Sequence, residues 1–556
     1  MKSKGSPLWG AFCVYTGSKL GGTISKNPFS EEQKRFTVCT PVYKDSYKYF
    51  DIFFQSLDQQ QYKHFEVCVV FDGANAKGEK ALLKVIKKYP HMDIKWETQE
   101  WGGAPKARNR AVAMGTGDYL TFLDPDIYVY SQTFQEWAVA FETNPNKDVI
   151  WGFYDIYLGP DKKAPVGGNI PVNAKGEPMY YALRASNYIS GGNPVRRSAF
   201  IGWDETVKSL QDWDMWQRML KEDNFEGKKF HFIAQSFFAT EPPQEGGISH
   251  DSSTNWKERV KYVREKNGIT IPDTVVCSLG APYHGVKTAM MLGADYLPMP
   301  SFKPNDYKTV YLLGFYTAEN PQMPITTKSH MQVFNSQKGK KIVHWIGTDV
   351  SQMHWNNSFQ KLKTLKNWFK NEKIIHLTEA QHTHDEMKEL GINSKIVPLP
   401  PGKLYEPLPL PEKFTIAVYD NPSQNMYKNE LMKEVALSMP DIDFKFFGNP
   451  NTAGKVEGNI EHMGWVEMDD LIPKCSMNLR VTVHDGLPLT PLQFMTAGRH
   501  AICSTPLYGA TKVSADRKEI VEAIRKVMTE PINPKAPPYW RKELDQEKFK
   551  KAIASL

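Results

Sequence analysis

Two carboxylates that flank a single proline, Asp124 and Asp126, are the residues of this chain whose types and spacing are best suited to chemistry. They follow the apolar segment Tyr119 to Leu123, which the pattern predicts as a strand. Carboxylate oxygens bind hard divalent cations, and such a cation can neutralise a diphosphate as a bond to it breaks. The spacing therefore points to transferase chemistry. An isolated Asp-x-Asp pair also occurs in ordinary solvated turns, so the surrounding segments decide between the two interpretations.

The segments upstream of this strand have a recognisable order. A Gly-rich loop at residues 102–103 leads into a predicted helix that carries Arg108, and a turn at residues 115–117 separates the helix from the strand. Two earlier strands are predicted. The first runs from Val38 to Tyr43, and the second, residues 67–75, contains Asp72.

In this order the three segments resemble the nucleotide-diphospho-sugar transferases of the large inverting family 2, which have the GT-A fold. Three ordered matches within about ninety residues are more specific than any one of them. The resemblance implies an α/β domain that binds Mn²⁺ or Mg²⁺ through Asp124 and Asp126. A UDP-sugar is the expected donor, because Asp72 matches the family's uridine-contacting acid. The residues that the resemblance implies for the donor nucleotide are Thr40, Pro41, Tyr43, Asp72 and Arg108.

Inverting transfer also needs a base, because the acceptor hydroxyl must lose its proton as the anomeric carbon develops positive charge. In the family an acidic pair at a helix start supplies this base from its second place, which is Asp212 here. The first place is Gln211, a departure that removes one charge and leaves the base intact. Asp212 could instead be a helix N-terminal acid, and Asp214 is a weaker candidate for the base that could orient the acceptor or serve the structure.

Residues for the sugar and for completing the metal site are implied by the same resemblance. Gly191 and Gly192 would let the donor sugar approach the backbone, since a Cβ there would obstruct it. Trp213 either forms an apolar wall of the sugar site or belongs to the core, because tryptophans three residues apart on a helix are often core residues. His250 resembles the late histidine of the family's metal site, although a lone histidine is often an ordinary surface residue.

Length and pattern divide the chain into several parts. A chain of 556 residues is too long for one core. Strand and helix patterns alternate in one α/β domain, a second alternation follows it, and a Pro-dense linker precedes a third. The predicted parts are an N-terminal arm (1–35), a GT-A domain (36–268), two Rossmann-like halves (269–404 and 412–530) and a C-terminal tail (531–556) with a helix from Arg541 to Leu556.

The two Rossmann-like halves resemble a GT-B glycosyltransferase fold, with the tail crossing back over the first half. The run from His484 to Phe494 looks like the sugar- and ribose-binding turn of retaining family 4 enzymes. That family has two glutamates eight positions apart, where this chain has Asp485 and Gln493, and no Arg-Lys pyrophosphate pair is evident. The region could therefore be a second active enzyme, a weakened relative that binds the acceptor, or a structural partner. Its candidate site residues are His284, Asp349, Lys428, Asp485 and Gln493.

Charge, cysteines and hydropathy limit the remaining choices. With 69 Lys and Arg against 62 Asp and Glu, the net charge of +7 permits an anionic partner without requiring one. The six cysteines are scattered singly, which favours reduced core residues, and no signal peptide or membrane span is evident. We therefore expect a cytoplasmic protein. The acceptor could be a polysaccharide precursor, a protein or a modified nucleic-acid base.

Two other classes of function compete with a bifunctional glycosyltransferase. Asp-x-Asp pairs also serve metal-dependent nucleotidyl and phosphoryl transferases, but the ordered series from Thr40 to Asp212 favours sugar transfer. A binding module with inactive catalytic sites is disfavoured for the first domain by Asp124, Asp126 and Asp212. It remains open for the second region, whose role could be limited to binding a polymer or nucleic-acid acceptor.

Overall fold

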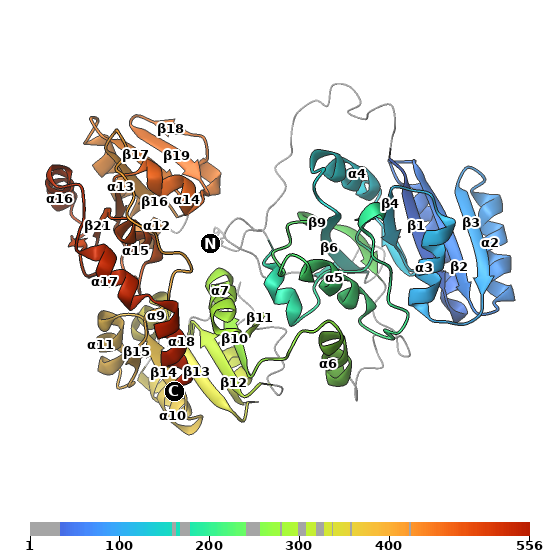
Figure 1. Cartoon of the computed structure of the whole chain (residues 1–556), viewed down its shortest axis with the longest axis horizontal. Helices are drawn as coiled ribbons and strands as arrows, with labels where there is room; N and C mark the ends of the chain where they lie inside the picture. Colours follow the sequence, from blue (N-terminus) through green and yellow to red (C-terminus); the bar gives the residue numbers. More distant parts are fainter. Residues whose placement is uncertain are drawn as a thin grey trace, which may run out of the picture. The chain divides into compact units, whose positions relative to one another are not determined.

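The computed structural model describes residues 34–157, 163–166, 178–240, 256–278, 281–298, 307–317, 327–335, 337–355, 359–421 and 424–556. The chain divides between Ile271 and Pro272 into two compact units, which we call the N-terminal and C-terminal units (Figure 1). The sequence analysis placed this boundary after residue 268. The expected arm over residues 1–35 lies almost entirely outside the described residues.

The N-terminal unit is built on a nine-stranded sheet with the order β3-β2-β1-β4-β8-β6-β9-β5, in which β7 pairs with β6. Strands β1 to β4 are mutually parallel, and the remaining strands add antiparallel pairs plus the parallel pair β6 and β9. The strands are β1 Phe36–Val42, β2 Phe65–Asp72, β3 Asp93–Gln99, β4 Tyr119–Phe122, β5 Ile127–Val129, β6 Val149–Tyr157, β7 Lys163–Val166, β8 Val195–Arg196 and β9 Phe230–Thr240.

Alternate residues of the parallel strands enter two separate cores, because successive side chains of a strand point to opposite faces. Val67 and Val69 of β2 join a core with α1, α2 and α4, whereas Cys68 and Val70 join a core with α3, α5 and α6. Burial on both faces explains the continuous apolar runs in the sequence. The helices are α1 Phe50–Asp58, α2 Ala76–Lys88, α3 Ala104–Met114, α4 Thr133–Thr143, α5 Gln211–Lys221 and α6 Trp256–Lys266.

The carboxyl ends of the parallel strands bring the predicted donor residues to one edge of this sheet. Tyr43 follows β1, Asp72 ends β2, and Asp124 follows β4 by two residues. Loops at the carboxyl ends of such strands are where open α/β sheets bind ligands. The order of the strands therefore places Asp72 and Asp124 along one edge, with Tyr43 between them.

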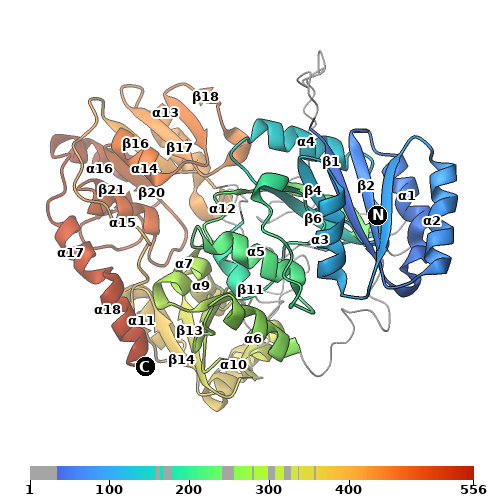
Figure 2. The ribbon, with the colours of Figure 1, turned by 45° about the vertical axis from the view of Figure 1, so that its right-hand side comes forward.

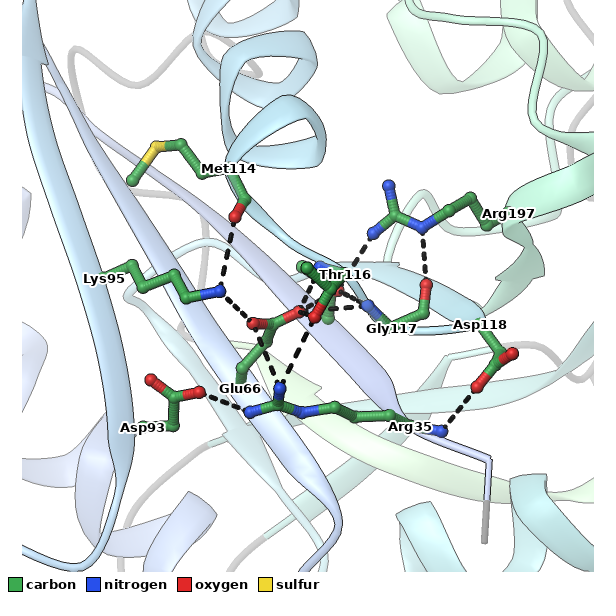
Figure 3. Close-up of polar contacts among 10 residues, drawn as sticks. Arg35, Glu66, Asp93, Lys95, Met114, Thr116, Gly117, Asp118 and Arg197 are labelled. Carbon is green, nitrogen blue, oxygen red and sulfur yellow. Dashed lines mark hydrogen bonds and ion pairs between the residues drawn. The ribbon is translucent and has the colours of Figure 1, made fainter. Parts of the chain in front are cut away.

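A buried carboxylate, Glu66, organises the opposite, amino edge of the same sheet (Figure 3). It accepts hydrogen bonds from Thr37 Oγ1 (2.8 Å), Gly117 N (3.0 Å) and Lys95 Nζ (2.7 Å), and Arg35 lies 3.6 Å away as an ion pair. Burial by itself would raise the pKa of Glu66, but hydrogen bonds from Lys95, the Thr116 backbone and Thr37 outweigh it and lower the pKa to about 2. The network ties β1, β2, β3 and the turn before β4 together.

We expect Glu66→Gln to lower the free energy of unfolding of the N-terminal unit by about 3 kcal/mol at neutral pH, because it removes the buried carboxylate that pairs with the partly exposed Lys95 and Arg35. The stabilisation from Glu66 is present above its ordinary pKa of 4.5 and is lost as the pH falls toward about 2. As the pH falls from 4.5 to about 2, the free energy of unfolding of the variant should therefore decrease less than that of the wild type. Hydrogen exchange of amides in β1 and β2 during denaturation would measure both effects.

Glu97→Gln is the matched control, because Glu97 of β3 is partly exposed and forms an ion pair with the exposed Arg110 of α3. Exposed pairs contribute about 1 kcal/mol or less. If the two variants lose equal stability, the buried network is not the anchor of this edge.

The C-terminal unit contains two sheets, each with helices between its strands (Figure 2). The first sheet has the order β11-β10-β12-β13-β14-β15 and is parallel throughout. We call the region of this sheet the first half. Its elements are β10 Thr274–Ser278, α7 Pro282–Leu292, β11 Asp295–Pro298, β12 Thr309–Leu313, α8 Thr327–Asn335, β13 Lys340–Trp345, α9 Thr348–Trp355, α10 Phe359–Asn371, β14 Ile375–Thr378, α11 Gln381–Glu389 and β15 Lys395–Ile396.

The second half is built on a seven-stranded sheet with the order β18-β19-β17-β16-β20-β21-β22, in which only β18 is antiparallel to its neighbour among the described pairs. Its strands are β16 Thr415–Tyr419, β17 Asp443–Phe447, β18 Val456–Glu457, β19 Ile460–Gly464, β20 Met477–Arg480, β21 His500–Cys503 and β22 Thr511–Lys512. Its helices are α12 Gln424–Tyr427, α13 Asn429–Leu437, α14 Met468–Leu471, α15 Leu489–Thr496 and α16 Arg517–Thr529.

The segment that joins the halves lies along the second half. Leu408 N donates to Ala497 O (3.1 Å), and the buried Arg499 donates to the carbonyl oxygens of Leu408 (3.1 Å) and Pro409 (2.6 Å). Arg499 thus holds the predicted Pro-dense connection through its backbone carbonyl groups. Proline residues have these acceptors although they lack a backbone N–H donor.

The C-terminal tail returns to the first half, but not as the single helix expected from Arg541 to Leu556. It forms α17 Ala536–Glu543, which packs against α15, and α18 Gln546–Ala554, which contacts α7 (Figure 1). The break occurs because Asp545 caps α18 by accepting a hydrogen bond from Lys548 N (2.7 Å). Prolines 537 and 538 fit the start of α17, where their missing N–H groups cost no helical hydrogen bond.

In the part of the chain that the structure describes, none of the helices combines the length and the apolar character that crossing a bilayer requires. Of the six cysteines, Cys39, Cys68, Cys277, Cys475 and Cys503 are buried free thiols, as expected for core residues.

Candidate active site

Asp72 holds the Gly-rich loop that follows β3. Its Oδ1 atom accepts hydrogen bonds from Gln99 Nε2 (2.9 Å) and Gly102 N (2.8 Å), and its Oδ2 atom accepts one from Gly103 N (2.8 Å). Three donors on one buried carboxylate fix both the side chain and the loop. Asp72 therefore shapes the start of α3, and a contact of Asp72 with a nucleobase stays a prediction.

Of the three residues predicted at the end of β1, only Tyr43 presents its side chain at the surface. Thr40 and Pro41 are buried within β1, because helices cover both faces of that strand, so side-chain contacts from these two to a nucleotide are not supported. Tyr43 is 43% exposed. Its loop is held by Asn75, the residue before α2, whose Nδ2 atom donates to Lys44 O (2.7 Å).

Arg108 of α3 joins the Asp-x-Asp segment to the start of α5. One terminal nitrogen, Nη2, lies 3.0 and 3.1 Å from the two carboxylate oxygens of Asp124, and the other, Nη1, donates to Gln211 Oε1 (2.8 Å). The guanidinium also lies over the Trp203 ring, 4.8 Å from its centre. The buried Nε atom of Arg108 has no hydrogen-bond partner among the described residues. The position of this cation suits an anionic group at the same edge.

The two aspartates offer oxygen ligands that fit a hard divalent cation. The Asp124 side chain is 44% exposed, and Asp126 is exposed. His250 lies outside the described residues, and no cluster of three or more His, Cys, Asp or Glu side chains suited to a metal occurs within the described ranges. Mg²⁺ in such sites is often held by one or two carboxylates and completed by substrate phosphates and water. Asp124 and Asp126 fit that pattern. Asp124 would then contact both the cation and Arg108.

Asp212 lies in the first turn of α5, one residue after the Gln211 that accepts from Arg108. Its Oδ2 atom accepts from Asn187 Nδ2 (3.0 Å), and its Oδ1 atom accepts from Trp213 N (2.9 Å). Burial raises the pKa of Asp212 above the ordinary value, although these hydrogen bonds and the Arg108 charge oppose the shift. A carboxylate with a raised pKa is better matched to accept a proton near neutral pH.

The glycine pair lies against this carboxylate and against the strand that leads to the Asp-x-Asp segment. A Cβ added to Gly191 would lie 3.2 Å from Asp212 Cβ. Thr121 of β4 donates from Oγ1 to Gly192 O (2.7 Å). The structure thus brings Gly191, Asp212 and the Arg108–Asp124 pair into one continuous region of the N-terminal unit.

Trp213 and Asp214 are both buried, so the expected roles in contacting the sugar or the acceptor are wrong for them. Trp213 is buried in the core and donates from Nε1 to Leu183 O (2.6 Å). Asp214 is fully buried and accepts from Arg218 Nε (2.9 Å) and Lys266 Nζ (2.8 Å). Because α5 turns these two residues inward, they are structural, which was the alternative interpretation of each.

Several residues of this region were not assigned from the sequence. Asn187 holds Asp212, and nothing in the local pattern distinguishes it from other loop asparagines. Trp203 is buried beneath Arg108, and Asn109 Nδ2 donates to its carbonyl oxygen (2.8 Å). Trp101 precedes the Gly-rich loop and is 70% exposed. Its place directly before two glycines is the feature of the sequence that could have identified Trp101 as a candidate.

In the C-terminal unit, the predicted Asp349 is a buried anchor at the carboxyl edge of the first sheet. It accepts from the backbone N–H groups of Phe315 (2.9 Å), Ile346 (3.0 Å) and Val350 (3.0 Å). Burial raises its pKa to about 6. The unpredicted Glu379 lies nearby. Burial, with the charges of Asp349 and Asp485 contributing, raises the pKa of Glu379 to about 8.

The loop around Asp485 contacts the first half closely. Asp485 Oδ2 accepts from Arg480 Nε (2.7 Å), and Glu379 accepts from Leu487 N (3.1 Å). A Cβ on Gly347 would lie 2.3 Å from Gly486 N, so the two backbones are in direct contact. The carboxylate of Asp485 is therefore engaged by Arg480 in a region where the two halves meet.

The other three predicted residues of this region occupy separate elements. His284 lies in α7, Lys428 precedes α13 and Gln493 lies in α15. Within the described residues, no hydrogen bond or ion pair joins their side chains to Asp349 or Asp485. The grouping of all five into one site is therefore still a prediction.

Part of the N-terminal unit is similar to a known protein family. Residues 37–203 match the family described as Glycosyl transferase family 2. An uncharacterized glycosyltransferase of Rickettsia conorii is 24% identical over 281 residues, which cover 47% of this chain and 42% of that protein. The poly(ribitol-phosphate) beta-N-acetylglucosaminyltransferase TarS of Staphylococcus aureus is 31% identical over 121 residues, which cover 21% of this chain and 20% of TarS.

This chain therefore spans less than half the length of these two relatives. Among solved structures, S. aureus TarS 1–349 in complex with UDP-GlcNAc is similar with a TM-score of 0.33 and 22% identity, covering 42% of this chain and 65% of that chain. The expected α/β class is confirmed, whereas the GT-B arrangement of the C-terminal unit stays a prediction. The match to Glycosyl transferase family 2 covers residues 37–203, which contain the Arg108–Asp124 pair, and it supports the enzyme class expected from the sequence.

Proposed function

We propose that the N-terminal unit transfers a sugar from a nucleotide-diphosphate sugar, by preference a UDP-sugar, to an acceptor hydroxyl with inversion. The proposal rests on the contacts of Arg108, which hydrogen-bonds both Asp124 and Gln211. Because Gln211 directly precedes Asp212, these contacts connect the guanidinium and the Asp-x-Asp segment to the candidate base, which Asn187 holds. The sequence match to TarS, named as an N-acetylglucosaminyltransferase, supports an activated sugar as the donor.

The proposed reaction is a single displacement. The acceptor oxygen forms a bond to the anomeric carbon while the bond from that carbon to the diphosphate breaks, and the diphosphate leaves with the electron pair. Asp212 takes the proton of the acceptor hydroxyl, and Asn187 fixes the carboxylate through its hydrogen bond. Gly191 leaves room for the sugar beside Asp212. Without a base, the acceptor oxygen would carry positive charge as it attacks.

Arg108, Asp124 and Asp126 stabilise the leaving group in this proposal. Asp124 and Asp126 would hold Mn²⁺ or Mg²⁺, which supplies positive charge to the departing diphosphate. Arg108 lies on Asp124 and over Trp203, so its charge is already placed at the same edge. A fixed guanidinium stabilises developing negative charge without reorganisation of water.

For the C-terminal unit we propose acceptor binding in preference to a second transfer reaction. The ion pair with Arg480 engages Asp485, the carboxylate that a second transfer reaction would need, and this disfavours a second reaction. The acceptor class stays open among a polysaccharide precursor, a protein and a modified nucleic acid. Sugar transfer that persists in a variant without Asp212 and is lost in Asp485→Asn would overturn the acceptor-binding proposal and indicate a second enzyme.

The donor proposal is tested by incubating the full chain with UDP-, GDP- and CDP-sugars, with and without Mn²⁺. We expect slow release of UDP from a UDP-sugar that depends on the cation, because water can replace the acceptor at low rate. Release of UMP or inorganic phosphate would instead indicate nucleotidyl or phosphoryl transfer. If all three donor classes stay intact even with a mixture of acceptors, the proposal is wrong.

A further inference from the structure

Trp101 is a large apolar side chain left at the surface on a loop that is held in place. It is 70% exposed, although the two residues that follow it, Gly102 and Gly103, both donate backbone hydrogen bonds to the buried Asp72. Gly73 N also donates to Gln99 O (3.0 Å), which ties the end of β3 to the residue after β2. A rigidly held, exposed tryptophan combines a large contact area with little conformational entropy to lose, which favours a binding role.

Tyr43 and Trp101 follow the outer two of three adjacent parallel strands, and Gly73 follows the middle one. The register pairs Val42 with Phe71 and Asp72 with Gln99, so these strand ends are nearly level. A Cβ on Gly73 would lie 3.8 Å from Trp101 Cβ, and the φ angle of Gly73 is +97°, which disfavours any larger residue. Gly73 thus places no side chain of its own between the two strands that lead to Tyr43 and Trp101.

The dimensions of this position suit a flat ring. Two strand spacings separate the backbones that carry Tyr43 and Trp101, about 9.6 Å in a regular sheet. A planar group in contact with an aromatic ring on each face needs about 7 Å, because carbon atoms in contact lie about 3.5 Å apart. A sugar ring is thicker and not planar.

The distance from the Asp-x-Asp segment also favours the base of the donor over its sugar. The sheet order β3-β2-β1-β4 places the end of β3 three strand spacings, about 14 Å, from the end of β4 that leads to Asp124. A group on Trp101 therefore lies at the far end of a donor whose diphosphate is near Asp124 and Arg108.

We propose that Trp101 forms the second wall of the nucleobase site, opposite Tyr43 and above Gly73. The inference rests on the proposed function, since it requires a nucleotide donor in this domain. The side chain contributes stacking that is tolerant of base identity, because every base has an aromatic face. Discrimination among bases would then depend on other groups.

The test is calorimetric titration of the full chain with UDP in the presence of Mn²⁺. We expect Trp101→Ala to weaken UDP binding about 10- to 100-fold, the range for loss of one stacked base, and Trp101→Phe to weaken it about threefold or less. Inorganic pyrophosphate, which has no base, should bind the wild type and both variants equally. Trp355→Ala is the matched control, because Trp355 is a similarly exposed tryptophan of the C-terminal unit, 60% exposed.

Three results of this titration would overturn the inference. Unchanged UDP affinity in Trp101→Ala would overturn the inference and leave the donor proposal standing. Equal weakening of UDP and pyrophosphate would also overturn it, because the substitution would then have disturbed the loop on Asp72. A wild-type chain that binds pyrophosphate but none of UDP, GDP and CDP would refute both this inference and the donor proposal.

Discussion

Asp212→Asn is expected to retain UDP-sugar binding and to lose sugar transfer by about two to four orders of magnitude, the range for removal of a general base. The amide can still accept from Trp213 N, so the start of α5 should keep its geometry. The loss should therefore fall on kcat, and the KM of the donor should change little. Initial rates across donor concentrations would separate the two parameters.

The pH dependence of the same reaction gives an independent check. Asp212 must be ionised to accept a proton, and burial raises its pKa. The rate should therefore fall as the pH drops through a value above that of an ordinary aspartate, and this acidic limb should be missing from the residual activity of the variant. Glu222→Gln, an exposed change at the other end of α5, is the control. Transfer near the wild-type rate in Asp212→Asn would move the base to another carboxylate.

Asp126→Ala is expected to abolish cation-dependent transfer while the fold is kept. Asp126 is exposed, so its removal should cost little stability, whereas a lost ligand leaves the departing diphosphate without its counter-charge. We prefer this position to Asp124, because removal of Asp124 would also strip Arg108 of its ion partner. Turnover at saturating Mn²⁺, with thermal unfolding measured in parallel, is the readout.

The control for this variant is Asp45→Ala, which removes an exposed carboxylate from the loop after β1 at the same edge of the sheet. It should keep both the rate and the Mn²⁺ dependence. Wild-type transfer that is insensitive to a chelator would contradict the metal proposal for this domain, and Arg108 would then be the main counter-charge to consider.

The parallel strands that support the candidate site were predictable because they are buried on both faces. Runs such as that from Val67 to Phe71 alternate between two cores, and this makes them apolar throughout. Strand β4 ends one residue before the predicted limit of Leu123, and it begins at the predicted Tyr119. Placement of Asp72 and Asp124 at one edge follows from parallel pairing, which strand and helix alternation implies.

The direction of individual side chains on α5 was not predictable in the same way. Asp212 and Asp214 are two residues apart, and only packing decides which faces Asn187 and which faces Lys266. The other omissions concern contacts that form only when the chain folds. The carboxylate of Glu66 is satisfied by residues before and after it in the chain, and Arg480 pairs with Asp485 across a loop. Neither the Glu66 network nor the Arg480–Asp485 pair produces a periodic pattern in the sequence.

The return of α18 to α7 has a consequence for how the C-terminal unit is assembled. Residues 546–554 follow the whole second half in the sequence, yet they complete a surface of the first half. During synthesis the first half therefore stays without this cover until the second half has emerged, and α18 then adds a further link between the halves to the contact of Gly347 with Gly486. Once linked, they should melt as a single cooperative block rather than as two independent sheets.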